Sequence, residues 1–339
     1  MSLLPFLHRA AAHQDLSAAQ AQEAMAIILG GRASTAQIAA FLVALRMKGE
    51  TSTELLGFAR AMREVASRVT PELRGAPLLD TCGMGGDGLG TFNISTIAAF
   101  VVAGAGVKVA KHGNRSISSR CGSADLLERL GVKVALGPAR AARAIEEIGI
   151  GFLFAPAYHP AMKHAQPARL ELKMRTVFNM LGPLTNPAGA TAQLVGASSP
   201  RAAELLAETL AALGLPRGFV VHGSDGLDEI TTTGQSLLLE VRDGAVISLH
   251  VAPAEFGVAQ ASPADLAGGD PERNAEIARA VLDGEDGPRR DVVLVNASAA
   301  LVAAGKASDF SAGTKLARKS IDSGAARARL AELAKFSQG

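Results

Sequence analysis

Short apolar segments that end in a glycine-containing or polar turn recur along the chain after Pro71, and helical patterns separate them. The segments of this form are PLLDTCG, VKVAKHGN, VKVALGP, GFLFAPAYH, TAQLVGA, GFVVHGSDG and DVVLVNAS. Their length and apolar content predict strands. Because strands that alternate with helices pair in parallel and carry the helices on their faces, the pattern predicts an α/β domain with a mostly parallel central sheet.

The chain before Pro71 has a helical pattern instead. Apolar residues recur at helical spacing in QAQEAMAIILGG, TAQIAAFLVALRMKG and STELLGFARAMREVA, and the opening MSLLPFLHRAAAHQ also reads as helix. The expected start signals are Ser17, Ser34 or Thr35, and Ser52 or Thr53, and the expected stops are Gly30, Gly31 and Gly49. We therefore expect a small all-helical domain at 1–70, joined by part of 166–188, and a large α/β domain at 71–339 that closes on the helix ARARLAELAKF.

The composition excludes several classes of protein. Hydrophobic residues make up 48% and charged residues 19%, which excludes a disordered chain. The formal charge of +2 gives no broad basic surface, so we expect no nucleic-acid partner. Cys82 and Cys121 are too few for a disulfide framework, and no export signal or long apolar segment occurs. We expect a cytoplasmic protein that has no membrane partner.

The first candidate binding motif is CGMGGDGLGTFNISTIAAF, in which a strand leads through closely spaced glycines into a helix. Glycines let main-chain amides approach a phosphate, and Ser95 and Thr96 add donors where the helix dipole favours negative charge. Asp87 favours a phosphorylated sugar over bare phosphate, because a carboxylate in an anion-binding loop needs a hydroxyl or a metal as its partner. The alternative is an ordinary glycine turn with a Ser/Thr cap, since neither the Rossmann nor the Walker A spacing is met.

The second motif is VAKHGNRSISSRCGSADLLERLG, which again reads as strand, turn and helix. Lys111, Arg115 and Arg120 supply positive charge, and several serines supply hydroxyl donors around two glycines. This combination suits a polyanion such as pyrophosphate. A solvated basic turn is the alternative, because Lys, Arg and Ser are common in loops.

The third motif is HGSDGLDEITTTG, in which Asp228 and Glu229 follow a strand. Adjacent carboxylates in a loop fit Mg²⁺, which prefers carboxylate oxygens and is completed by waters and substrate phosphates. An acidic helix start is the alternative. Two neighbouring polyanion loops favour the metal, because a divalent ion stabilises a departing pyrophosphate.

The fourth motif is YHPAMKHAQPARLELKMRTVFNMLGPLTNP. Tyr158, His159, Met162, Arg169 and Arg175 offer an aromatic face, hydrogen bonds and cations that suit an aromatic carboxylate. The alternative is that the tyrosine and the histidines are structural and that the arginines lie on a helix surface.

Together and in this order, GMGGDGxxTFNIST, KHGNRSISSRCGSADLLE, HPAMKHxxPxRxELxxRTxFNMLGPLTNP and DGLDE closely resemble the anthranilate phosphoribosyltransferase family over nearly the whole chain. The resemblance implies transfer of the phosphoribosyl group from phosphoribosyl pyrophosphate to the amine of anthranilate, in the second step of tryptophan biosynthesis from chorismate. It implies no covalent enzyme nucleophile. It also implies the nucleoside phosphorylase/phosphoribosyltransferase type of fold, two Mg²⁺ ions per subunit and a homodimer paired through the helical domains.

By matching positions, the resemblance assigns contacts with phosphoribosyl pyrophosphate to Gly83, Gly86, Asp87, Thr91, Asn93, Ile94, Ser95, Thr96, Lys111, His112, Gly113, Asn114, Arg115, Ser116, Ile117, Ser118, Ser119 and Ser123. It assigns anthranilate to Gly83, Asn114, Arg169, His112, Tyr158 and His159, and the metal to Ser95, Asp228 and Glu229. One position departs from the family pattern: Met84 stands where Thr is usual, so a hydroxyl donor is lost there.

Two other classes share the expected fold. A nucleic-acid-binding relative without transferase activity is disfavoured by the near-neutral charge and by the presence of Asp228, Glu229 and Arg169. A pyrimidine nucleoside phosphorylase is disfavoured because its substrate motifs are absent, whereas the block from HPAMK to TNP is present.

Overall fold

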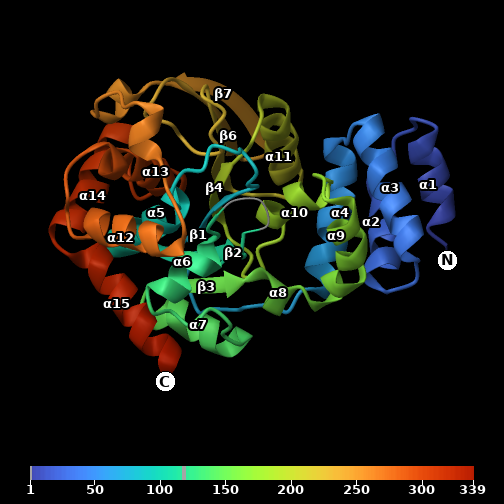
Figure 1. The fold of residues 1–339 in the computed structure, drawn as a ribbon, viewed down its shortest axis with the longest axis horizontal. Coiled ribbons are helices and arrows are strands. Elements are labelled where there is room, and N and C mark those ends of the chain that lie inside the picture. The colour runs from blue at the N-terminus through green and yellow to red at the C-terminus, as the bar shows by residue number, and fades with distance from the viewer. Residues whose placement is uncertain (1, 117–119) are drawn as a thin grey trace.

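The computed structural model describes residues 2–116 and 120–339, and the helices at its N-terminal end form one side of the molecule (Figure 1). They are α1 (Leu4–Ala11), α2 (Ala18–Leu29), α3 (Thr35–Lys48) and α4 (Ser52–Val65). Ser17 and Ser34 cap α2 and α3 as the sequence predicts. The cap of α4 is Thr51, one residue before the predicted Ser52 or Thr53, because the Thr51 hydroxyl accepts the Glu54 amide at 3.2 Å.

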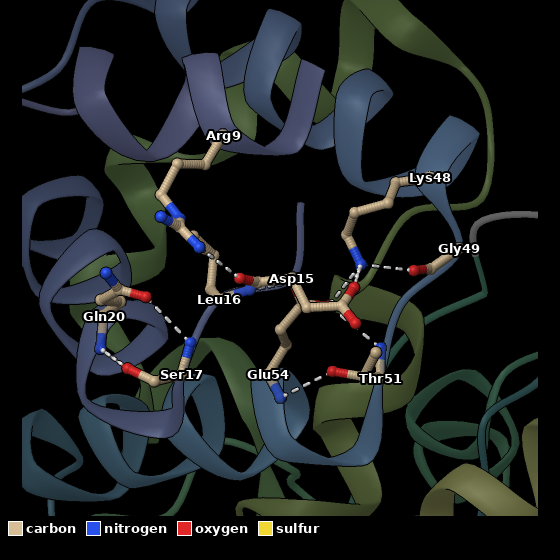
Figure 2. A network of polar contacts seen from close by, with 9 residues as sticks. All are labelled: Arg9, Asp15, Leu16, Ser17, Gln20, Lys48, Gly49, Thr51 and Glu54. Carbon is tan, nitrogen blue, oxygen red and sulfur yellow. Dashed lines mark hydrogen bonds and ion pairs between the residues drawn. The ribbon is translucent and has the colours of Figure 1, made fainter. Parts of the chain in front are cut away.

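A buried carboxylate holds these helices together (Figure 2). Glu54 is fully buried, and it accepts the main-chain amides of Leu16 and Thr51, each at 3.0 Å. The ammonium of Lys48 lies 3.0 Å from the same carboxylate and 2.6 Å from Asp15. The carboxylate that completes the cap of α4 therefore also fixes the loop that precedes α2.

The large sheet is mostly parallel, as the sequence predicts. Its strands are β1 (Leu78–Gly83), β2 (Lys108–Gly113), β3 (Ile150–Phe154), β4 (Ala192–Gly196), β5 (Arg217–Gly223), β6 (Ser236–Arg242) and β7 (Ala245–Val251). They are arranged in the order β3-β2-β1-β4-β5-β6-β7, with parallel pairing from β3 to β5 and antiparallel pairing of β5 with β6 and of β6 with β7.

Two strand predictions are wrong. The segment 132–138 alternates buried and exposed side chains but joins no ladder, since its Lys133 amide bonds the Ser337 hydroxyl instead. The segment 291–298 lies inside helix α13 (Pro288–Ala303), because a short buried apolar run has no periodicity that separates a strand from a buried helix. The hairpin of β6 and β7 was not predicted, although Asp243 and Gly244 between its strands both have positive φ, as a tight hairpin turn requires.

Helices cover both faces of the sheet. The remaining ones are α5 (Ile94–Gly104), α6 (Ser123–Arg129), α7 (Pro138–Glu147), α8 (Ala155–Tyr158), α9 (Gln166–Leu172), α10 (Phe178–Leu184), α11 (Pro200–Ala212), α12 (Pro271–Leu282), α14 (Phe310–Asp322) and α15 (Ala325–Gln338), with single 3₁₀ turns at Pro160–His164, Pro253–Phe256 and Pro263–Leu266. On one face, α5 and α13 contact the parallel strands; on the other, α10 and α11 do so. Consecutive residues Leu194 and Val195 accordingly belong to different cores.

The segment 166–188 connects the two parts of the molecule. Helix α9 packs against α3, and α10 packs against α4. Ala168 and Phe178 share a core with Phe41 of the helical part, and this core continues to Val195 of the sheet. The packing supports the proposed division into 1–70 and 71–339, with part of 166–188 added to the first. Within the described ranges, no helix is both long enough and apolar enough to span a bilayer.

Candidate active site

A cavity of about 770 Å³ lies at the carboxyl ends of β1 and β2. Apart from one residue, every described residue that the family resemblance assigns to the site lines it: Gly83, Gly86, Asp87, Thr91, Asn93, Ile94, Ser95, Thr96, Lys111, His112, Gly113, Asn114, Arg115, Ser116, Ser123, His159, Arg169, Asp228 and Glu229. The predicted contacts Ile117, Ser118 and Ser119 lie outside the described residues. Of the other candidates in the motifs, Met162 lines the cavity, whereas Arg120 and Arg175 do not. The four sequence motifs are therefore brought to a single place.

The exception is Tyr158, which was expected beside the anthranilate site. Its side chain is fully buried in a separate core with Val69 and Leu78, and its hydroxyl donates to the Leu136 carbonyl at 2.7 Å. Tyr158 ends helix α8, and only the next residue, His159, lines the cavity. The prediction that Tyr158 lines the aromatic-acid channel is wrong.

The glycine loop after β1 depends on backbone conformations that other residues rarely adopt. Gly85, Gly86, Gly88 and Gly90 have φ values of 69°, 82°, 78° and 67°. A residue far along the chain also stabilises this loop, because the Gly268 amide donates a hydrogen bond to the Gly90 carbonyl at 3.0 Å. It ends where helix α5 begins, so main-chain amides and a helix N-terminus face the same cavity.

The acidic pair Asp228 and Glu229 lies against this loop. Asp228 Oδ2 accepts the Gly85 amide at 2.9 Å, and Glu229 Oε1 accepts the Ser95 amide at 3.1 Å. Two glycines make the approach possible, because a Cβ on Gly196 would lie 1.6 Å from the Asp228 carbonyl oxygen and one on Gly83 would lie 2.5 Å from Asp228 Oδ2. The acidic loop and the glycine loop therefore fit together only at these small residues.

Burial raises the pKa of both carboxyl groups. The pKa of Asp228 is raised by burial and by the neighbouring charges of Glu229 and Asp87, and that of Glu229 is raised to about 7, mainly by burial. A cation at this position would relieve the repulsion. Among the described residues, no group of three or more His, Cys, Asp or Glu side chains encloses a metal position, so water and substrate phosphate would complete the coordination, as is usual for Mg²⁺.

Lys111 supplies a buried positive charge beside the acidic pair. Its side chain is almost fully buried, and its ammonium donates to the Thr81 carbonyl at 2.5 Å and to the Ser95 hydroxyl at 3.4 Å. Burial lowers the pKa of Lys111. The ammonium therefore lies between β1 and the N-terminal end of α5, where a polyanion bound at that helix end would meet it.

The turn after β2 is fixed by Asp125 of α6. The Asp125 carboxylate accepts the amides of Ser116 at 3.1 Å and Gly122 at 2.9 Å. The guanidinium of Arg115 pairs with Asp125 at 3.0 Å and with Glu128 at 2.6 Å. Arg115 lines the cavity, and the positive charge of its guanidinium is balanced by these two carboxylates. In a solvated basic turn, the alternative considered for this motif, the guanidinium would have no carboxylate partner.

A second wall of the cavity is apolar and cationic. The rings of His112 and His159 lie 5.2 Å apart, and the Arg169 guanidinium lies 5.2 Å from the centre of the Phe178 ring. No carboxylate pairs with Arg169 in the part of the chain that the structure describes. An unpaired guanidinium beside an aromatic ring is suited to an aromatic carboxylate.

Both histidines are neutral at physiological pH. Burial lowers the pKa of His112 to about 3 and that of His159 to about 4. His112 Nδ1 donates to the Gly182 carbonyl at 3.1 Å, so Nε2 is the unprotonated nitrogen of the neutral ring, and it has no hydrogen-bond partner within residues 2–116 and 120–339. For His159, a main-chain hydrogen bond with Thr185 partly opposes the effect of burial on the pKa. The neutral His112 ring therefore offers an acceptor in this wall.

Several lining residues were not predicted from the sequence. Met62 comes from α4, Asn179 and Pro183 come from α10, and Pro156 comes from α8. The last three lie in or near the singled-out fourth motif, but Met62 is one of many apolar residues in a regular helix. Nothing in the sequence separates it from the core positions around it.

Acidification is expected to destabilise the protein through the buried histidines. Because their pKa values are lower in the folded than in the unfolded state, the unfolded chain gains protons first, and stability is lost as the pH falls below about 6.5. The loss at pH 5 should be about 2 kcal/mol for each histidine. Urea unfolding at pH 8 and pH 5 checks this. Between the two pH values, the free energy of unfolding should fall less in the double variant His112→Gln/His159→Gln than in the parent. The control variant His250→Gln, on the exposed β7, should behave like the parent. An unchanged pH dependence in the double variant would contradict this origin.

The chain matches a family model described as "Glycosyl transferase family, helical bundle domain" over residues 4–66 and one described as "Glycosyl transferase family, a/b domain" over residues 75–327. It is 68% identical over 336 residues to the anthranilate phosphoribosyltransferase of Solibacter usitatus (strain Ellin6076), with 99% of each chain covered.

Two solved structures are similar over almost the whole length. The crystal structure of anthranilate phosphoribosyltransferase from Thermus thermophilus has a TM-score of 0.93 and 46% identity, covering 98% of this chain and 99% of that chain. The Saccharomyces cerevisiae enzyme in complex with phosphoribosyl pyrophosphate and Mg has a TM-score of 0.90 and 27% identity, covering 99% of this chain and 98% of that chain.

Proposed function

The chain belongs to the anthranilate phosphoribosyltransferase family, and from this membership we infer that its large cavity holds both substrates of the family's reaction. The reaction transfers the phosphoribosyl group from phosphoribosyl pyrophosphate to anthranilate. It gives N-(5-phosphoribosyl)anthranilate and pyrophosphate, and it is the second step of tryptophan biosynthesis from chorismate.

One observation carries the assignment of the cavity. Its lining has two walls of different chemistry. In the first, Lys111, the glycine loop and the acidic pair are joined by hydrogen bonds through Ser95 and Gly85; in the second, the two neutral histidines lie against each other and Arg169 lies beside Phe178. We assign the first wall to phosphoribosyl pyrophosphate and the second to anthranilate. The carboxylate of anthranilate would then meet Arg169, and its ring would lie beside the histidines.

Mg²⁺ fits the acidic wall, where Ser95, Asp228 and Glu229 would hold it. When bound, it stabilises the negative charge that develops on pyrophosphate as the bond to the ribose breaks. Lys111 is positioned to oppose the same charge from β2. Two ions per subunit are part of this proposal, and calorimetric titration of the enzyme with substrate and Mg²⁺ tests that number.

The remaining residues position the attacking amine. An aryl amine is largely unprotonated at neutral pH, so the chemistry needs no strong base and no covalent nucleophile. Its main requirement is that the amine and the ribose carbon approach in one orientation. Arg169 and the histidine wall would supply that orientation, and the unprotonated Nε2 of His112 can accept an amine hydrogen.

A fluorescence assay tests the proposed function. Anthranilate fluorescence should decrease when phosphoribosyl pyrophosphate and Mg²⁺ are added together to the enzyme, and it should persist when either is omitted. Unchanged fluorescence under saturating conditions would overturn the proposal, as would release of a free base from a pyrimidine nucleoside with inorganic phosphate.

Replacing Met84 by Thr is expected to strengthen binding of phosphoribosyl pyrophosphate. Met84 is half-buried at the cavity, its amide donates to the Gly196 carbonyl at 2.9 Å, and its sulfur accepts the Ser198 hydroxyl at 3.5 Å. A hydroxyl at this position adds one donor to the loop, so KM for phosphoribosyl pyrophosphate should fall by about threefold to tenfold. Ser198→Ala serves as the control, since it removes the sulfur contact and the hydrogen bond from Arg175 at 3.0 Å without adding a donor at position 84. An unchanged KM in Met84→Thr would mean that the neighbouring amides already compensate.

We also propose a cytoplasmic homodimer that pairs through the helical part. Exposed apolar side chains gather there: Leu4 is 40% exposed, Met47 73%, Leu170 59% and Met174 43%. Such side chains are common at interfaces between subunits. Sedimentation equilibrium should give twice the chain mass, and Met47→Glu should shift the equilibrium towards monomer if this surface is the interface.

A further inference from the structure

The ladder between β1 and β2 stops before the two strands do. The paired residues are Leu78 with Lys108 and Leu79 with Val109, whereas β1 runs on to Gly83 and β2 runs on to Gly113. On their outer sides both strands remain paired to their ends, β1 with β4 and β2 with β3. The strands therefore separate at their carboxyl ends, where the cavity lies.

Side chains replace the missing main-chain bonds in this gap. Asp80 Oδ1 accepts the His112 amide at 3.0 Å, and Lys111 Nζ donates to the Thr81 carbonyl at 2.5 Å. Asn186 Nδ2 donates both to Asp80 Oδ2 and to the Ala110 carbonyl, each at 2.8 Å. In a regular parallel ladder, with strands about 4.8 Å apart, the main-chain amides and carbonyls of these residues would bond one another directly. Here side chains bridge them instead.

The orientation of Asn186 is determined by its neighbours. Its Oδ1 accepts the Ala188 amide at 2.9 Å, so its nitrogen must face Asp80 and Ala110. Asp80 is fully buried and Asn186 is 6% exposed, so water does not substitute for either. Asn186 belongs to the GPLTNP segment at 182–187. Two other residues of this segment accept hydrogen bonds through their main-chain carbonyls, Gly182 from His112 and Leu184 from Arg63.

We propose that Asp80 and Asn186 are positioning residues that keep the ends of β1 and β2 apart, so that Lys111 is held towards the phosphate wall and His112 towards the anthranilate wall. The inference rests on the proposed function of the two walls. Lys111 and His112 are consecutive on β2, and their side chains leave opposite faces of the strand, so one displacement of the strand end moves both. Neither positioning residue needs to touch a substrate.

The test compares Asp80→Asn, Asn186→Ala and the exchanged pair Asp80→Asn/Asn186→Asp with Gln193→Leu. Gln193 is the control for a buried hydrogen bond beside Asp80, because it is buried, its side chain donates to the Pro183 carbonyl of the same segment at 2.9 Å, and on β4 it pairs with Asp80 from the side of β1 that faces away from the gap. Asp80→Asn should lower kcat by about tenfold or more, because an amide cannot accept from both of its donors. Asn186→Ala should lower kcat by about fivefold, and Gln193→Leu should stay within about twofold of the parent.

The exchanged pair distinguishes positioning from simple support of the fold. It restores one donor and one acceptor between positions 80 and 186 but sets a carboxylate oxygen against the Ala110 carbonyl, so its kcat should recover only partly above that of Asp80→Asn alone. Folded variants whose kcat and KM match the parent, or a Gln193→Leu loss as large as that of Asp80→Asn, would overturn the proposal. Failure of both Asp80→Asn and Asn186→Ala to fold would assign the pair to folding and would also overturn it.

Hydrogen exchange separates this proposal from the proposed function. In Asp80→Asn the amide of His112 should exchange faster than in the parent, whatever substrate the enzyme uses. If the parent does not turn over anthranilate, the proposed function fails while this measurement still tests the gap. Unchanged exchange at His112 would overturn the positioning role in an enzyme of any activity.

Discussion

Replacing Asp228 by Asn and Glu229 by Gln together is expected to lower kcat by about 10³-fold or more, because the pair supplies adjacent carboxylates at the phosphate wall and a metal held there supplies several kcal/mol of charge stabilisation. The substitutions keep the size and shape of both side chains. Initial rates measured across a Mg²⁺ titration check the result. Near-normal activity at saturating Mg²⁺ would contradict the metal assignment.

The same variant should remain folded. Burial and mutual repulsion raise the pKa of both groups, which means that the folded state disfavours their charges at neutral pH. Neutral amides remove that repulsion, so Tm in the absence of metal should equal or exceed that of the parent. Mg²⁺ with phosphoribosyl pyrophosphate should raise Tm in the parent and leave it almost unchanged in the variant. A large fall in Tm would show that the two carboxylates are needed to stabilise the glycine loop. The loss of kcat would then be explained by misfolding and not by loss of the metal.

The phosphate-binding wall of the site could be predicted from the sequence because all of its motifs follow strands of the sheet. Parallel strands end at one edge of the sheet, so the motifs after β1, β2 and β5 had to meet there once the strands were identified. The glycines and the acidic pair also carry their chemistry locally. The same reasoning failed for Tyr158, since which of two consecutive residues faces a cavity depends on the packing of α8 against β3 and not on residue type.

The fold could likewise be predicted where the sequence carries a local signal, and not where the structure depends on distant neighbours. The capping serines of α2 and α3 are local signals and were identified, whereas segment 291–298 reads as strand or buried helix until its neighbours are known. The hairpin of β6 and β7 carried a local signal in Asp243 and Gly244 that could have identified it. The bridge from Asp80 to Asn186 joins residues far apart in the chain, and no spacing in the sequence predicts it.

Replacing Arg169 by Met is expected to raise KM for anthranilate by about 100-fold, while kcat and KM for phosphoribosyl pyrophosphate stay within about threefold, because the carboxylate of anthranilate loses its half-buried guanidinium partner in the variant. Met keeps much of the apolar contact with Phe178, whose ring lies 5.2 Å from the guanidinium. The measurement is a pair of substrate titrations. Arg201→Met on the exposed surface of α11 is the matched control and should leave all three constants unchanged.

Aniline provides the decisive control for Arg169, because it has the amine and the ring of anthranilate without the carboxylate. If Arg169 acts through that carboxylate, the parent and Arg169→Met should use aniline equally poorly, and the difference between the enzymes should appear with anthranilate alone. An equal loss with both amines would mean that Arg169 shapes the cavity wall through Phe178. In that case the carboxylate must be bound elsewhere along the wall, and Asn179, which lines the cavity one residue after Phe178, would be the next side chain to replace.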